Sequence, residues 1–145
     1  MKKIPFALLG LLLSLTGIAQ TTHYSSTNGI AIKGYDPVAY FLQNKAIEGS
    51  DEFTTDWSDS KWKFSTKANL DSFKIAPEKY APQYGGYCAY GCSENHKSPT
   101  DPNAWTIVNN KLYLNYNLKV KDYLKKETDK RIAAADANWK TLNKE

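Results

Sequence analysis

Some segments of the chain repeat their hydrophobic positions every second residue, as strands do, and others every three to four residues, as helices do. Apolar and polar residues alternate over residues 52–57 and again over residues 61–64, which is typical of half-buried strands. The polar segment 58–60 between them predicts a turn, so we expect an antiparallel hairpin. On its second strand, Trp62 and Phe64 would face the core.

A second hairpin is predicted around residue 110. Residues 105–108 and 111–115 are rich in apolar and β-branched residues, and Asn109-Asn110 separates them. Asparagine tolerates the positive φ angle that a two-residue turn requires, so this segment favours a tight connection. The proline-containing residues 77–82 predict another tight turn.

Helical spacing and capping residues predict three helical regions. The first begins at Asp36-Pro37, because aspartate caps free backbone amides and proline fits the first helical position. The second starts at Ser65 or Thr66 and ends at about residue 76, before a proline. The third runs from Asn117 to the C-terminus.

The first 19 residues have the pattern of a secretory signal peptide. Two lysines precede an apolar run at residues 4–15, and the small residues Gly17 and Ala19 favour cleavage before Gln20. The apolar run is shorter than the roughly 20 residues that span a bilayer. We therefore expect a periplasmic or secreted protein with no membrane attachment after cleavage; an uncleaved N-terminal anchor is the alternative.

Removal of the signal peptide leaves 126 of the 145 residues, which suits one domain with one core. The polar residues 20–29 predict a flexible leader. Residues 30–145 predict a single α+β domain, with a small antiparallel sheet of hairpins, packed helices and a C-terminal helical extension.

The charge of the remaining chain argues against a nucleic-acid partner. It holds 17 basic and 15 acidic side chains, and no polybasic stripe. The lysines of residues 119–130 alternate with acidic residues, which is typical of a solvated helix face.

Candidate chemistry gathers in residues 84–96, which contain both cysteines and one of the two histidines. Thiolate and imidazole ligands suit Cu(I) and Zn(II). On a helix, Cys88 and Cys92 would lie ~6 Å apart along the axis and share one face. His96 can join them as a third metal ligand only if the helix ends by about Cys92.

Three other states of the cysteines are consistent with the sequence. Exported compartments are oxidising, so Cys88 and Cys92 could form a disulfide. Cysteine also packs as a small hydrophobe, which would leave two buried free thiols. A thiol oxidoreductase is a further alternative, and it would need an activated thiolate and an orienting partner.

Tyr84, Tyr87 and Tyr90 recur every three residues in the same segment. Aromatic rings at this spacing either line a pocket for a planar organic ligand or belong to an aromatic core. We take them as candidate ligand-binding residues.

Long strings of the sequence resemble the secreted YHS-domain proteins of bacteria. The resemblance covers Ile30 to Trp139 and rests on Gly34-Tyr35-Asp36-Pro37-Val38-Ala39-Tyr40-Phe41, Trp62-Lys63-Phe64, residues 77–90, Asp101-Pro102 and residues 112–116. It implies a small α+β domain of a metal-associated kind, with relatives fused to copper and heavy-metal ATPases. Cys88 falls within the family's Tyr-Cys-Ala-Tyr segment, whereas Cys92 and His96 lie outside that pattern.

The sequence thus favours an exported binding protein over an enzyme. Our first hypothesis is soft-metal binding or delivery in the periplasm, with copper before zinc and with Cys88, Cys92 and His96 as ligands. The alternative is an aromatic-faced module that binds an organic ligand or a periplasmic protein partner. In that case the two cysteines only pack or form a disulfide.

Overall fold

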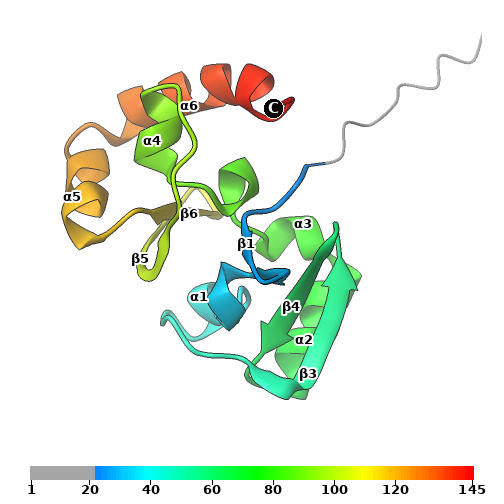
Figure 1. The fold of residues 1–145 in the computed structure, drawn as a ribbon. Coiled ribbons are helices and arrows are strands. Elements are labelled where there is room, and N and C mark those ends of the chain that lie inside the picture. Colours follow the sequence, from blue (N-terminus) through cyan, green and yellow to red (C-terminus); the bar gives the residue numbers. More distant parts are fainter. Residues whose placement is uncertain (1–21) are drawn as a thin grey trace, which may run out of the picture.

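The computed structural model describes residues 22–145 and shows a mixed α+β domain (Figure 1). Two small, mostly antiparallel sheets pack with helices, and the chain ends in helices, which confirms the expected fold class. The predicted signal peptide, residues 1–19, lies outside the described residues. Within residues 22–145 no helix combines the length and the apolar character needed to cross a membrane.

The first sheet has four strands in the order β1-β2-β4-β3. Its strands are β1 (Ser26–Thr27), β2 (Ile30–Ala31), β3 (Ser50–Trp57) and β4 (Ser60–Phe64). Strands β3 and β4 form the predicted antiparallel hairpin, and β2 lies parallel to β4 with Ile30 opposite Lys61. Trp62 and Phe64 are fully buried, as the alternation predicted.

The second sheet is the predicted hairpin of β5 (Asp101–Val108) and β6 (Lys111–Asn115). Asn109 and Asn110 both have positive φ angles, 51° and 59°, as the tight turn requires.

Six α-helices and two 3₁₀ helices complete the described chain. They are η1 (Ile32–Gly34), α1 (Ala39–Leu42), α2 (Lys67–Ile75), α3 (Pro77–Tyr80), η2 (Gln83–Gly86), α4 (Ala89–Ser93), α5 (Leu118–Lys126) and α6 (Thr128–Leu142). Two details differ from the prediction. Residues 77–80 form a short helix instead of a turn, and the C-terminal helical region breaks at Glu127, whose φ and ψ are −139° and 44°.

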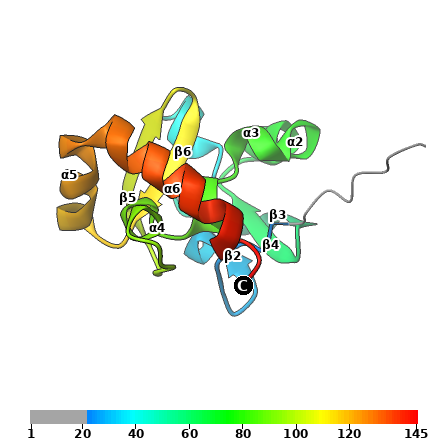
Figure 2. The same ribbon diagram turned by 90° about the horizontal axis from the view of Figure 1, so that it is seen from above.

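The buried side chains form two clusters. The first lies against the four-stranded sheet, where the ring of Trp62 packs on Trp57 and Phe73. The second lies between α4, β6 and α6, and Figure 2 shows α6 running across this part of the molecule. Burial of each large apolar side chain contributes about 1.5–3 kcal/mol, so these clusters supply most of the driving force for folding.

The described part of the predicted leader is anchored to the domain. Strand β1 pairs with β2, and the backbone N–H of Ser25 donates to the carbonyl of Gly85 at 2.7 Å. The ring of Tyr24 lies 5.3 Å from that of Trp57 and 5.1 Å from that of Trp62, between centroids. The prediction of a flexible segment over residues 20–29 overlooked this aromatic contact.

Asp36 is fully buried, and its carboxyl group accepts hydrogen bonds from three segments of the chain. Its Oδ1 accepts backbone N–H groups of Val38 at 2.8 Å and Ala39 at 3.2 Å, which is the predicted cap of α1. Its Oδ2 accepts the N–H of Ser65 at 2.8 Å, the hydroxyl of Ser65 at 2.7 Å and the Nδ2 of Asn69 at 2.8 Å. One carboxyl group therefore joins the start of α1, the end of β4 and helix α2.

Replacement of Asp36 by alanine is expected to lower the free energy of unfolding by about 3–5 kcal/mol, because several buried donors would lose their acceptor. Urea denaturation followed by circular dichroism measures this loss. Asp71→Ala is the matched control, since Asp71 only pairs with Lys67 on the exposed face of α2, and such pairs contribute about 0.3–0.5 kcal/mol. Equal small losses in both variants would contradict the role assigned to Asp36.

Candidate functional site

The Cys88 sulfur is held in a fixed position at the start of α4. It accepts the backbone N–H of Gly91 at 3.4 Å, as the cap of that helix, and the backbone N–H of Tyr116 at 3.3 Å. The residue is only 1% exposed. These two hydrogen bonds fix the position of the sulfur, which is covered from solvent.

A buried asparagine lies beside this sulfur. Asn115, the last residue of β6, is fully buried, and its Oδ1 accepts the N–H of Tyr90 at 3.3 Å and the Cys88 thiol at 3.9 Å. Its Nδ2 is buried without a hydrogen-bond partner among the described residues. The sequence places Asn115 at the end of the second predicted hairpin and within the string 112–116 that carries the resemblance, but neither pattern indicates that its side chain lies beside Cys88.

Cys92 lies one helical turn after Cys88, and its backbone N–H donates to the Cys88 carbonyl at 2.9 Å. Its side chain is fully buried in the second cluster. Burial raises the pKa of the Cys92 thiol to about 12, so this group is neutral at physiological pH.

Both cysteines are free thiols in the structure. The structure therefore does not contain the alternative Cys88–Cys92 disulfide. The physical reason is that the two side chains have different surroundings. Cys88 lies outside α4 as its N-cap, with ψ at 118°, and its sulfur accepts the N–H groups of Gly91 and Tyr116, whereas Cys92 packs in the second cluster.

His96 follows the end of α4, which stops at Ser93, about where the three-ligand hypothesis required. Its backbone N–H donates to Gly91 at 3.0 Å, and its side chain is exposed. Across residues 22–145, no three His, Cys, Asp or Glu side chains are grouped in a way that could hold a metal ion. The structure thus keeps the two cysteines on one helical turn but does not bring His96 into a common ligand set with them.

Tyr84 belongs to the core and not to an open face. It is 5% exposed, and its hydroxyl donates to Asp136 on α6 at 2.8 Å. Burial, and then the bond to Asp136, raise the pKa of Tyr84 well above its usual range. The backbone of Tyr84 has a positive φ of 55°, so the three-residue spacing of the tyrosines does not correspond to one helix face.

Tyr87 and Tyr90 are half-buried and lie on separate surfaces. The Tyr87 ring is 6.3 Å from the Trp139 ring, and the Nζ of Lys97 lies 5.4 Å from its centroid. The guanidinium carbon of Arg131 lies over the Tyr90 ring, 4.5 Å from its centroid. The three predicted ligand-binding tyrosines therefore do not line one pocket.

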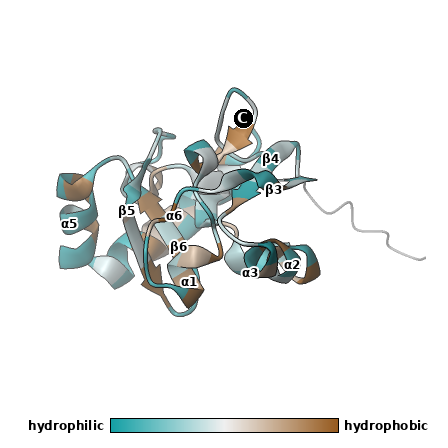
Figure 3. Cartoon of the chain, turned by 90° about the horizontal axis from the view of Figure 1, so that it is seen from below, coloured by the Kyte–Doolittle hydropathy of each residue, from teal (hydrophilic) through white to brown (hydrophobic). Residues whose placement is uncertain are grey.

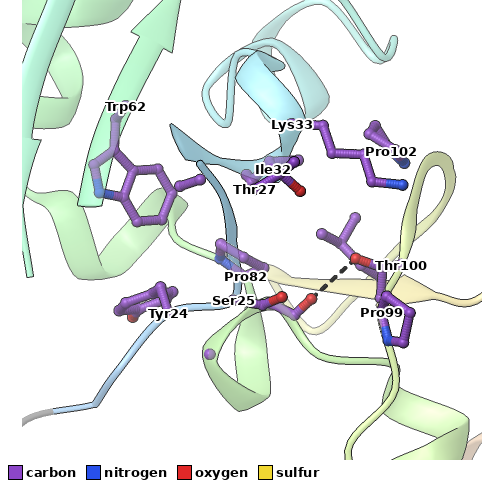
Figure 4. Close-up of a pocket in the computed structure, with 14 residues that line it drawn as sticks. Tyr24, Ser25, Thr27, Ile32, Lys33, Trp62, Pro82, Pro99, Thr100 and Pro102 are labelled. Carbon is purple, nitrogen blue, oxygen red and sulfur yellow. Dashed lines mark hydrogen bonds between the residues drawn. The ribbon is translucent and has the colours of Figure 1, made fainter. Parts of the chain in front are cut away.

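A small cavity separates the N-terminal strands from the loop before β5 (Figure 4). Tyr24 and Trp62 line one side and Pro99 and Thr100 the other, while the Thr100 hydroxyl donates to the Gly86 carbonyl at 3.0 Å. Its volume of about 30 Å³ has room for about two water molecules. It is too small for an organic ligand.

Comparison of the chain with protein-family models, with curated proteins and with solved structures finds no match. The YHS resemblance therefore rests on the sequence strings alone, and the interpretation of the site depends on its geometry.

The burial of both thiols predicts slow chemical modification. In denaturant, two thiols per chain should react at once with dithionitrobenzoate. In the native protein the reaction should be slower by about 100-fold or more, because modification needs local opening.

A Thr141→Cys variant supplies the matched control, since residue 141 is exposed and its thiol should react fast in the native state. Fast native reaction of Cys88 and Cys92, or fewer than two reactive thiols in denaturant, would contradict the structural assignment.

Proposed function

We propose that this protein binds a soft metal ion, Cu(I), through the sulfurs of Cys88 and Cys92. The observation that supports the proposal best is the pair of free thiols one helical turn apart. One of these sulfurs is already held by two backbone N–H groups. The resemblance to a metal-associated family points in the same direction.

The donor set fits copper better than zinc. Cu(I) is a soft ion that accepts thiolate ligands and tolerates a coordination number of two. Zinc in structural sites takes four ligands in a tetrahedron, which needs more donors than Cys88 and Cys92.

Copper must displace the thiol protons, because only thiolates act as ligands. Burial raises the pKa of the Cys92 thiol to about 12, so below that pH each bound ion displaces the proton of this side chain. The apparent affinity for Cu(I) is therefore expected to rise with pH, by up to about tenfold per pH unit for each proton released.

Access to the site would require a small movement of the chain. The backbone of Tyr116, whose side chain is 53% exposed, covers the Cys88 sulfur in the turn between β6 and α5. Displacement of this turn would expose the sulfur to solvent. A binding protein of this kind, exported as its N-terminal sequence predicts, would buffer or deliver copper in the periplasm.

The test is a titration of the reduced mature chain, residues 20–145, with Cu(I) against the chelator bathocuproine disulfonate under anaerobic conditions at pH 6.5, 7.5 and 8.5. We expect one ion per chain, with an affinity that increases over this range. Cys88→Ser and Cys92→Ser should each abolish competitive binding, and serine at residue 88 retains the capping oxygen that α4 needs.

His96→Ala is the matched control, because His96 lies outside the proposed ligand pair. The affinity of this variant for Cu(I) should stay within about twofold of the affinity of the unsubstituted chain. Absence of competitive binding by the original chain, or unchanged binding by the double cysteine variant, would contradict the proposal. A large loss of affinity in His96→Ala would contradict the two-thiolate site.

A further inference from the structure

An open hollow lies where α4, α5 and α6 meet, and neither cysteine lines it. We call it the tyrosine hollow, and its lining residues are Tyr90, Tyr123, Lys126, Glu127 and Arg131. Its volume is about 380 Å³. Figure 1 shows α5 beside the ends of α4 and α6, which together form this corner of the molecule.

Two aromatic rings form the floor of the hollow. The centroids of Tyr90 and Tyr123 lie 6.0 Å apart with the ring planes tilted by 48°. Tyr123 is 38% exposed, so its ring offers an apolar surface to solvent. A planar ring is the group that packs best on such a floor.

The cations around the hollow divide into two kinds. Arg131 lies over Tyr90 and is already engaged, because it pairs with Glu94 and Glu127. The Nζ atoms of Lys126 and Lys119 lie 5.6 Å and 5.9 Å from the Tyr123 centroid. Neither lysine forms an ion pair within the described part of the chain, so both are available to an anion.

The positive charge of the described chain is concentrated on helix α5. Residues 22–145 hold 17 basic and 15 acidic side chains, and α5 alone contributes four lysines and one aspartate. The rest of residues 22–145 therefore has 13 basic and 14 acidic side chains. Figure 3 shows hydrophilic and hydrophobic residues side by side on α5. An anion approaching the protein would be attracted to this end of it.

We propose that the tyrosine hollow binds a small organic anion that carries an aromatic ring. The ring packs against Tyr123 and Tyr90, and the anionic group lies between Lys126 and Lys119. The attraction between a cation and an aromatic ring keeps both lysine side chains beside the Tyr123 ring, so part of the entropic cost of ordering them is met before a ligand binds. The site is separate from the proposed copper ligands, and it assigns a role to Tyr90 that the sequence pattern suggested only in general terms.

Phenyl phosphate is a suitable probe because it combines the two features in one small molecule. Inorganic phosphate carries the charge without the ring, and phenol carries the ring without the charge. Titrations followed by ¹H–¹⁵N NMR should give saturable shifts with phenyl phosphate, centred on Tyr90, Tyr123 and Lys126. Phosphate and phenol should each bind at least about tenfold more weakly, because each lacks one of the two contacts.

Variants locate the site on the protein. Tyr123→Ala and Lys126→Gln should each weaken phenyl phosphate binding by about fivefold or more. Lys125→Gln is the matched control, since Lys125 is an exposed lysine on the same helix but does not line the hollow. It should change the affinity by less than about twofold.

The proposal would be overturned by the absence of saturable shifts, by equal binding of phosphate and phenyl phosphate, or by equal losses in Lys125→Gln and Lys126→Gln. The NMR spectra also report whether each variant is folded. Unchanged phenyl phosphate binding by the Cys88→Ser, Cys92→Ser double variant is expected, which separates this test from the test of copper binding.

Discussion

The buried carboxyl group of Asp36 is the interaction on which the arrangement of the first half of the domain depends. A carboxyl group without solvent is costly unless hydrogen bonds satisfy it, and here five donors converge on its two oxygens. The donors come from segments around residues 38, 65 and 69, so this one carboxyl group links the start of α1, the end of β4 and α2. The aromatic cluster around Trp62 and Phe73 then fills the space that this polar centre defines.

The second half of the domain has a comparable polar centre that is left incomplete. The Cys88 sulfur accepts N–H groups from α4 and from the β6–α5 turn, and its thiol donates to the Oδ1 of Asn115 at the end of β6. In contrast to Asp36, this centre keeps one buried donor, the Nδ2 of Asn115, without a partner among the described residues. Both oxygens of Asp36 accept hydrogen bonds, whereas the Cys88 centre retains a buried donor that no described residue satisfies. We therefore treat Asp36 as part of the framework, and the proposal of a metal at Cys88 rests on its free, preoriented thiol.

The sequence predicted the elements of the fold better than it predicted the site. Both hairpins and the cap of α1 follow from local patterns, which are visible within a few residues. The remaining partners of Asp36 are about 30 positions away in the chain, so no local pattern indicates them. Asn115 was missed for the same reason, because only the folded chain shows that it is buried beside Cys88. The three tyrosines were grouped by spacing alone, but α4 begins only at Ala89, after the turn that contains Tyr84. Their side chains therefore point to different surroundings.

We propose, as the central claim, that the sulfurs of Cys88 and Cys92 bind one copper ion. X-ray absorption at the copper edge of the reduced mature protein, loaded with one equivalent of Cu(I), tests this claim most directly. The account predicts a first shell of two sulfur atoms and no scattering from an imidazole ring, because His96 lies outside the ligand pair. A shell that contains imidazole nitrogen, or one that lacks sulfur, would contradict it.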